Sequence, residues 1–250
     1  MLSNSLQQTE DWKLDKISYD AAYDKERITA YLFLPRKLKP PFQTVVYFPG
    51  ASALYERSSA ALSQGDSDFD FIIKSGRAVM FPVYKGTFER FNDYSSHPQT
   101  SSFYRDNVIA CSKDLGRSID YLETRPDLDR QKLAYEGSSW GAAMGAILPA
   151  MEERLKALVL IGPGFYMQKR FPAADQINFA PRVKAPVLML NGRYDFIFPT
   201  NSSQEPMFHL LGTPAEHKRR ILYDSGHDIP RPQMIKETLN WLDHYLGPVN

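Results

Sequence analysis

The sequence contains a single cysteine, Cys111, so no internal disulfide can stabilise the fold. No apolar run approaches the ~18–20 residues that cross a bilayer, and we expect no membrane partner. The 30 lysine and arginine residues almost balance the 29 aspartate and glutamate residues, which gives a net charge of +1. A chain so balanced has no overall basic field of the kind that binds nucleic acid, and we expect no nucleic-acid partner.

The rest of the composition is typical of a soluble globular domain. Hydrophobic residues make up 43% of the 250 residues and charged residues 24%, whereas a disordered chain is poorer in apolar residues and more strongly charged. No repeat or Gly/Ser linker divides the chain, so we expect one domain over residues 1–250. The first residues lack the basic and apolar segments of a signal peptide, and the compartment stays open, with the cytoplasm slightly favoured.

Short apolar runs alternate with helix-like segments along most of the chain. Residues 16–23 and 26–34 alternate in polarity and predict an antiparallel pair, preceded by an N-terminal extension over residues 1–15. Runs that predict buried strands lie at residues 44–48, 78–83, 132–135, 157–161, 187–190 and 220–223. Segments that predict helices lie at residues 106–124, 142–153 and 233–246. This order indicates an α/β fold with a mostly parallel sheet covered by helices on both faces.

The sequence Gly137-Ser138-Ser139-Trp140-Gly141 matches the pattern G-x-S-x-G with Ser139 at its centre. A predicted strand precedes it and a helix-like segment of small residues follows it, which is the setting of a nucleophile elbow. The alternative is a glycine-rich nucleotide-binding turn, but dinucleotide sites space their glycines as G-x-G-x-x-G. Ser139 is therefore the candidate nucleophile.

A serine hydroxyl needs a neighbouring base, which is oriented by an acid. Of five histidines, only His227 lies in a glycine-containing loop directly after a predicted strand; the others are His97, His209, His217 and His244. Asp195 follows another predicted strand and is the candidate acid, with Asp224 and Asp228 as rivals. The predicted order is then nucleophile, acid and base at Ser139, Asp195 and His227.

Backbone amides are expected to stabilise the oxyanion of the tetrahedral intermediate. The amide of Trp140 follows the nucleophile directly. The second donor is expected in the turn Pro49-Gly50-Ala51 after the first buried strand, where we choose the Ala51 amide. An ordinary turn at the end of a strand is the alternative reading of Ala51.

Two segments rich in aromatic residues, 85–105 and 162–183, are candidate pocket-lining insertions above the sheet. Tyr84, Phe88, Phe165 and Tyr166 are the candidate substrate-binding residues, although such aromatics are equally suited to a core. No cluster of histidine and carboxylate residues has the spacing of metal ligands, so we expect neither metal nor cofactor. Cys111 falls on the apolar stripe of a predicted helix and is expected to be a packed residue rather than a nucleophile.

The elbow, the order of Ser139, Asp195 and His227, and the turn Phe48-Pro49-Gly50-Ala51 resemble the α/β-hydrolase superfamily over residues 16–247. Within it the chain resembles dienelactone-hydrolase-like and acetyl-xylan-esterase-like carboxylesterases. Residues 84–90 and 241–249 are similar to esterase domains at the C-terminal end of larger bacterial proteins, which implies an excised domain. Pro49 stands where many relatives have histidine, and Ala142 stands where prolyl-oligopeptidase relatives have glycine.

The resemblance implies a serine carboxylesterase that hydrolyses small to medium acyl or aryl esters, with a small-molecule ester as its partner. Two alternatives stay open. The first is a serine peptidase or amidase that uses the same triad. The second is a non-catalytic module with a hydrolase fold, although none of the three triad residues is missing here.

Overall fold

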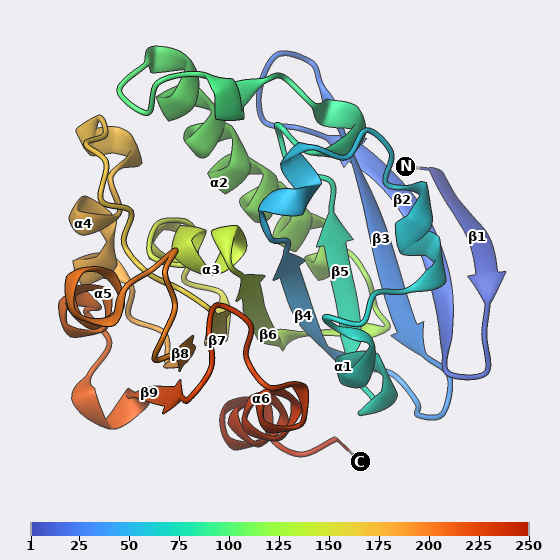
Figure 1. Cartoon of the computed structure of the whole chain (residues 1–250). Helices are drawn as coiled ribbons and strands as arrows, with labels where there is room; N and C mark the ends of the chain where they lie inside the picture. Colours follow the sequence, from blue (N-terminus) through green and yellow to red (C-terminus); the bar gives the residue numbers. More distant parts are fainter. Residues whose placement is uncertain (1, 250) are drawn as a thin grey trace.

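A nine-stranded sheet runs through the centre of the protein (Figure 1), with the strand order β1-β2-β3-β5-β4-β6-β7-β8-β9. The computed structural model describes residues 2–249, and the side chains of residues 9–249. The strands are β1 (Leu2–Gln8), β2 (Trp12–Asp20), β3 (Arg27–Pro35), β4 (Phe42–Phe48), β5 (Ala78–Pro82), β6 (Leu128–Ser138), β7 (Leu155–Ile161), β8 (Val187–Gly192) and β9 (Lys218–Tyr223).

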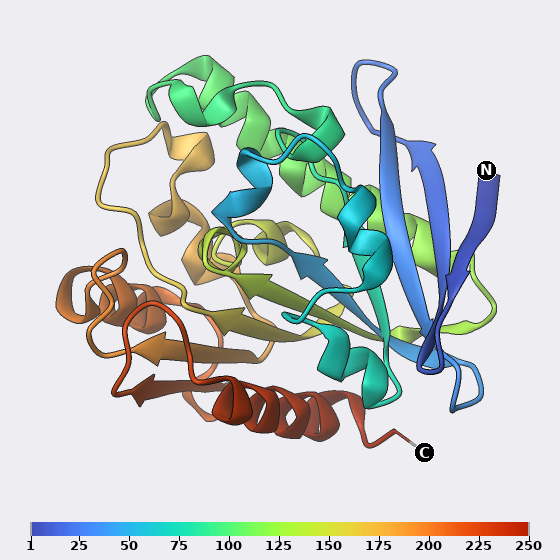
Figure 2. The same ribbon diagram turned by 45° about the vertical axis from the view of Figure 1, so that its right-hand side comes forward.

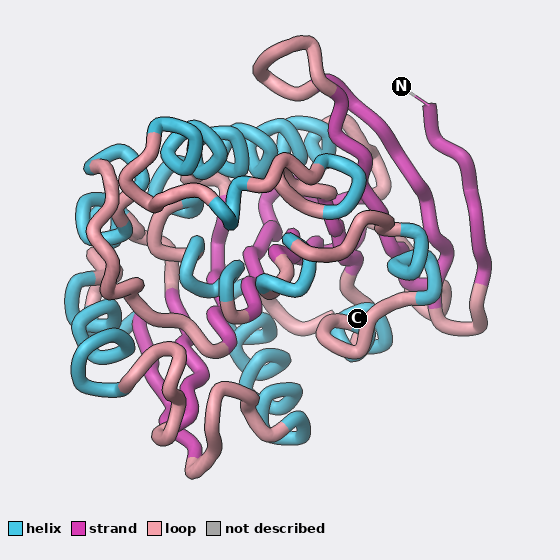
Figure 3. The backbone as a smooth tube through the Cα atoms, turned by 45° about the horizontal axis from the view of Figure 1, so that its top comes forward, coloured by secondary structure: helices cyan, strands magenta, loops and turns pink. Residues whose placement is uncertain are grey.

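The sheet is antiparallel from β1 to β5 and parallel from β5 to β9. In Figure 3 the antiparallel strands stand at one edge of the molecule, with the N-terminus on the outermost. The buried parallel strands are the short apolar runs of the sequence, because both of their faces are covered. The mostly parallel sheet predicted from the sequence is confirmed.

Helices cover both faces of the sheet (Figure 2). They are α1 (Asp70–Lys74), α2 (Ser102–Glu123), α3 (Trp140–Met144), α4 (Gln176–Phe179), α5 (Glu205–Leu210) and α6 (Arg231–Leu246). α1 and α6 lie on one face, and α2 and α3 lie on the other. Among residues 2–249, no helix combines the length and apolarity needed to span a membrane.

Two sequence predictions need correction. The predicted helix over residues 142–153 is wrong: α3 ends at Met144, and only a short 3-10 helix follows at Leu148–Met151. Gly145 packs so tightly that an added Cβ would lie 2.4 Å from Leu160, and the Pro149 nitrogen cannot donate a helical hydrogen bond. The expected N-terminal extension is part of the sheet, since residues 1–15 include β1 and the start of β2.

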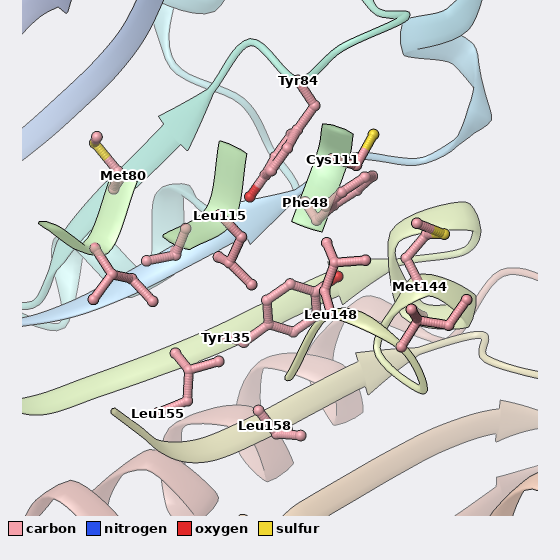
Figure 4. Close-up of a cluster of buried hydrophobic side chains, with 14 of the residues drawn as sticks. Phe48, Met80, Tyr84, Cys111, Leu115, Tyr135, Met144, Leu148, Leu155 and Leu158 are labelled. Carbon is pink, nitrogen blue, oxygen red and sulfur yellow. The ribbon is translucent and has the colours of Figure 1, made fainter. Parts of the chain in front are cut away.

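Two apolar clusters form the core, one on each face of the sheet. Figure 4 shows the cluster beneath α2 and α3. In it, Phe48, Tyr84 and Tyr135 lie among aliphatic side chains. The rings of Phe48 and Tyr84 stack with centroids 4.0 Å apart. Cys111 belongs to this cluster and is fully buried, so it is a packed residue.

Candidate active site

Ser139 occupies the sharp turn between β6 and α3. Its backbone has φ +48° and ψ −104°, a conformation that costs about 1–3 kcal/mol for a residue with a side chain. Three backbone hydrogen bonds hold the turn: Ser139 N to Ile161 O at 2.7 Å, Gly141 N to Pro49 O at 3.1 Å, and Ala143 N to Ser139 O at 2.8 Å. The neighbouring strands therefore fix the strained conformation that raises the Ser139 hydroxyl above the sheet.

The two outer glycines of the G-x-S-x-G pattern are needed for close packing. A Cβ on Gly137 would lie 2.5 Å from the carbonyl of Gly141. A Cβ on Gly141 would lie 2.2 Å from the carbonyl oxygen of Phe48. Both distances are far below van der Waals contact, so any side chain at either position would push the turn away from the sheet.

The structure brings Ser139, His227 and Asp195 into one hydrogen-bonded line. His227 Nε2 is 2.7 Å from Ser139 Oγ, and His227 Nδ1 is 2.7 Å from Asp195 Oδ2. Asp195 follows β8 and His227 follows β9, so both side chains come from loops at the same end of the parallel strands as Ser139. This geometry allows the imidazole to accept the serine proton while the carboxylate fixes its tautomer.

The Asp195 carboxylate is buried and well supplied with donors. Its Oδ1 accepts hydrogen bonds from the amides of Ile197 at 2.8 Å and Phe198 at 3.0 Å. Burial alone would raise the pKa of Asp195, but the hydrogen bonds from His227 and from these amides outweigh burial and lower that pKa below its ordinary value. The carboxylate is therefore charged throughout the range in which an imidazole titrates.

The rival residues lie elsewhere. His97, His209, His217 and His244 are all exposed. His217 Nδ1 is 3.1 Å from the Tyr245 hydroxyl, and the His97 ring lies against Phe103. Asp224 pairs with Arg193 at 2.9 Å, and Asp228 lies next to His227 in the chain while Asp195 holds Nδ1.

Ala51 begins a 3-10 helix (Ala51–Leu54) directly after the turn that follows β4, and Trp140 begins α3. Gly50 lies beside Ser139, because a Cβ on Gly50 would be 3.7 Å from the Ser139 Cβ. Within residues 2–249, neither the Ala51 amide nor the Trp140 amide donates to another group of the chain. Two N–H groups without a partner in the chain thus belong to the residues that directly follow Gly50 and Ser139.

A cavity of about 260 Å³ opens beside Ser139 and His227. It is lined by Ser67, Asp68, Ser138, Ser139, Ile161, His227, Asp228, Ile229, Arg231 and Met234. Its wall comes from the loop before α1 and from the start of α6, so it lies on the α1 and α6 face of the sheet. A larger cavity of about 480 Å³ lies elsewhere, between Tyr23 and Lys113, and contains no residue of the triad.

None of the four predicted substrate-binding aromatics lines the cavity at Ser139. Tyr84 and Phe88 are core residues, with exposures of 0% and 3%. Phe165 is also buried, and Tyr166 packs edge-on against Phe198, whose ring centroid lies 6.0 Å from that of His227. Tyr84 and Phe88 both follow the end of β5, and each packs into one of the two apolar clusters, Tyr84 into the cluster beneath α2 and α3 and Phe88 into the cluster on the other face.

The two predicted insertions also differ in their relation to the site. Within residues 85–105, Lys85, Asn92 and Phe103 line the larger, separate cavity. Residues 162–183 begin against the site, because a Cβ on Gly162 would lie 3.2 Å from the His227 ring. The second segment therefore reaches the triad, whereas the first contributes to a cavity that contains no triad residue.

Sequence reasoning missed the polar wall of the cavity at Asp68 and Arg231. The sequence could have suggested Arg231, because this residue follows His227 closely in the chain and lies at the start of the last helix. No sequence pattern pointed to Asp68 as a residue of the site, since Asp68 lies in a polar stretch far from Ser139 in sequence. Among the described residues, no group of three or more histidine, cysteine, aspartate or glutamate side chains is arranged to hold a metal ion.

Comparisons with known proteins agree with this architecture. The sequence profile of the dienelactone hydrolase family matches residues 30–228. No curated protein matches the chain in sequence. A cold-adapted esterase from an Arctic intertidal metagenomic library has 19% identity and a TM-score of 0.76 over 98% of this chain and 100% of that one.

Two further solved structures share the fold. Acetyl xylan esterase 1 from Thermoanaerobacterium sp. is 15% identical, with a TM-score of 0.76 over 98% of this chain and 87% of that one. A protein described as a dipeptidyl aminopeptidase IV from Bacteroides ovatus is 16% identical, with a TM-score of 0.74 over 95% of this chain but 36% of that one. At such identities the likeness establishes the α/β-hydrolase fold.

Proposed function

This chain belongs to the dienelactone hydrolase family and is a carboxylic ester hydrolase, and from that premise we propose that it cleaves small to medium acyl or aryl esters through an acyl-enzyme on Ser139. The observation that carries the proposal is the line of two 2.7 Å hydrogen bonds from Ser139 through His227 to Asp195. Ser139 acts as nucleophile, His227 as general base and Asp195 as the group that orients the imidazole.

In the first half of the reaction, Ser139 Oγ attacks the ester carbonyl carbon and its proton passes to His227 Nε2. The carbonyl oxygen becomes an oxyanion that accepts hydrogen bonds from the Ala51 and Trp140 amides. The intermediate collapses, the bond to the alcohol oxygen breaks, and the alcohol leaves with the proton from Nε2. The acyl group stays on Ser139.

In the second half, water attacks the acyl-enzyme and gives its proton to His227. The second tetrahedral intermediate uses the same amides, and its collapse returns the proton to Ser139 Oγ and releases the carboxylic acid. The modest cavity of about 260 Å³ beside Ser139 supports substrates of small to medium size.

A fluorophosphonate probe and a series of p-nitrophenyl acyl esters test this proposal. We expect the wild-type enzyme to be labelled once and to hydrolyse the short members, and Ser139→Ala to lose both properties. Ser138→Ala is the matched control for labelling, because Ser138 precedes Ser139 in the chain while His227 Nε2 is hydrogen-bonded to Ser139 Oγ. Labelling that persists in Ser139→Ala and disappears in Ser138→Ala would reassign the nucleophile.

The peptidase alternative is tested with aminoacyl p-nitroanilides under the same conditions. An ester hydrolase of this kind should cleave the p-nitrophenyl esters at least about a hundredfold faster than the anilides, because the aniline is the poorer leaving group and its departure needs protonation. Comparable rates on both would favour an amidase. Absence of turnover and of labelling would favour the non-catalytic module.

A further inference from the structure

The loop that carries Asp195, residues 192–198, has little apolar packing of its own. Its large apolar side chains next to the acid face solvent, with exposures of 67%, 83% and 47% for Tyr194, Phe196 and Ile197. Phe198 is buried, but it lies at the far end of the loop. A segment with so few buried apolar contacts depends on hydrogen bonds to keep one conformation.

Gln204 makes two hydrogen bonds that close this loop. It is fully buried and ends a π-helical turn, Thr200–Gln204, that leads into α5. Its Nε2 donates to the carbonyl oxygen of Gly192 at 2.9 Å and to that of Phe198 at 2.8 Å. Gly192 is the last residue of β8, and Phe198 is the last residue of the loop. A single side-chain amide therefore joins the two ends of the loop.

The amide of Gln204 uses its donors fully and its acceptor not at all. An amide nitrogen carries two N–H donors, and both point at loop carbonyls. Gln204 Oε1 is buried and has no hydrogen-bond partner within the described residues, which costs stability. An apolar side chain of the same length would avoid that cost, but it would leave the carbonyls of Gly192 and Phe198 without this donor. The amide is thus suited to holding the loop rather than to filling the core.

The loop end that Gln204 holds also holds the Asp195 carboxylate. Asp195 Oδ1 accepts from the amides of Ile197 and Phe198, and its Oδ2 is 2.7 Å from His227 Nδ1. Phe198 connects the two groups, because its carbonyl accepts from Gln204 while its amide donates to Asp195. A displacement of Phe198 would therefore displace the carboxylate from the imidazole.

We propose that Gln204 is a positioning residue, which keeps the Asp195 loop in the conformation that brings the carboxylate to His227. The proposal rests on the proposed function, because Asp195 contributes to catalysis through the base that activates Ser139. Gln204 does not line the cavity beside Ser139, so it acts through Asp195 and not on the substrate. Its loss should consequently weaken the transition state and leave substrate binding almost unchanged.

Gln204→Met tests the proposal, because methionine keeps the length of the side chain and removes both donors. We expect kcat for a p-nitrophenyl ester to fall about tenfold or more, with KM changed less than about twofold. In an Asp195→Asn background the same substitution should change kcat less than about twofold, because the loop then has no carboxylate to orient.

Thr213→Val is the matched control at the other end of the same strand. The buried Thr213 hydroxyl donates at 2.7 Å to the carbonyl of Ala185, two residues before β8 begins. Valine keeps the branched shape and removes this donor. Thr213→Val should therefore lower the melting temperature, as Gln204→Met does, and keep kcat and KM. All rates are measured at a temperature at which circular dichroism shows every variant to be folded.

Proton magnetic resonance reports the position of Asp195 without turnover. The proton between His227 Nδ1 and Asp195 Oδ2 lies in a short, charge-assisted hydrogen bond and should resonate far downfield of the other N–H protons. Its absence in His227→Ala identifies it. We expect Gln204→Met to move this resonance upfield or to broaden it, and Thr213→Val to leave it in place. If Gln204→Met does not fold, Gln204→Asn, which draws the amide back by one methylene group, carries both measurements with the same expected direction.

The outcomes separate this proposal from the proposed function. In Gln204→Met, a kcat within about twofold of the wild type or an unchanged resonance would overturn the positioning role. A fall in kcat that is equally large in the Asp195→Asn background, or equally large in Thr213→Val, would also overturn it and leave the esterase intact. Absence of hydrolysis and of probe labelling in the wild type would overturn the proposed function, whereas the resonance would still show whether Gln204 holds Asp195.

Discussion

The hydroxyl of Tyr135 donates a hydrogen bond to the carbonyl oxygen of Gly141 at 2.6 Å, across the base of the turn that presents Ser139. Tyr135 is fully buried on β6, and Figure 4 shows its ring directed toward the segment that includes α3. The bond therefore joins the strand before the elbow to the helix after it. The acceptor is the carbonyl of the residue after Trp140, whose amide is the proposed oxyanion donor.

Tyr135→Phe should remove this bond without changing the ring. We expect the free energy of unfolding to fall by about 1 kcal/mol, because the Gly141 carbonyl loses one of its two donors and keeps the Gly145 amide at 3.0 Å. The kcat for a p-nitrophenyl ester should fall by up to about tenfold with a smaller change in KM, since misplaced donors weaken the transition state. Chemical denaturation and steady-state kinetics measure the two effects. An unchanged kcat in a destabilised protein would limit Tyr135 to a packing role.

Gly141→Ala should be far more damaging than Gly226→Ala. The added methyl at residue 141 would meet the Phe48 carbonyl oxygen at 2.2 Å, whereas at residue 226 it would meet no atom within 4 Å. We expect a loss of about 3 kcal/mol or more, or insoluble protein, for Gly141→Ala, and a change within about 0.5 kcal/mol for Gly226→Ala. Thermal unfolding of the two variants side by side checks the contrast.

A buried arginine holds the C-terminal helix. Arg77 is 1% exposed, and it donates to Gln43 at 2.9 Å and to Asp243 of α6 at 2.5 Å. Arg77→Met should cost about 2–4 kcal/mol, because it strands the buried Gln43 oxygen and breaks a partly buried ion pair. Arg27→Met, at an exposed pair with Asp20, is the control and should cost about 0–1 kcal/mol. Equal losses in the two variants would contradict the role of burial.

The triad residues should act as a unit. Ser139→Ala and His227→Ala should each remove nearly all ester hydrolysis, and the double variant should be little worse than either single one. Asp195→Asn should cost less but still about 10²–10⁴ in kcat, because the imidazole loses its orienting carboxylate. Losses that multiply in the double variant, measured on one p-nitrophenyl ester, would mean that the two residues do not share one step.

The sequence was sufficient to predict the parts of this fold that depend on local pattern. The parallel strands are apolar runs, and the pattern around Ser139 requires glycines that the structure explains through the contacts of Gly137 and Gly141. The order of Asp195 and His227 followed from their places after later strands. Those places predict proximity because all parallel strands end at one edge of the sheet.

What the sequence could not predict depended on long-range packing. The helix after Ser139 stops at Met144, since Gly145 must approach Leu160 of β7, and no local signal reveals that contact. Aromatic residues near strand ends suit a pocket or a core equally well, and Tyr84 packs into the core because Phe48 stacks on it. Asp68 reaches the cavity only through the fold of the loop before α1.

The pH dependence of the reaction follows from the charges of the triad. The base must be neutral to accept the Ser139 proton, so kcat/KM should fall on acidification along a single ionisation. The lowered pKa of Asp195 adds no second ionisation near neutral pH, because its carboxylate stays charged there. Since the folded pKa of Asp195 lies below the unfolded one, its contribution to stability is complete above about pH 4 and is lost only as the pH falls further.

Inactivation by an organophosphate should follow the same pH curve as kcat/KM, because both reactions remove the Ser139 proton. EDTA should change neither rate. A kcat/KM that falls with two protons, an organophosphate rate independent of pH, or a strong loss of activity in EDTA would each contradict this mechanism.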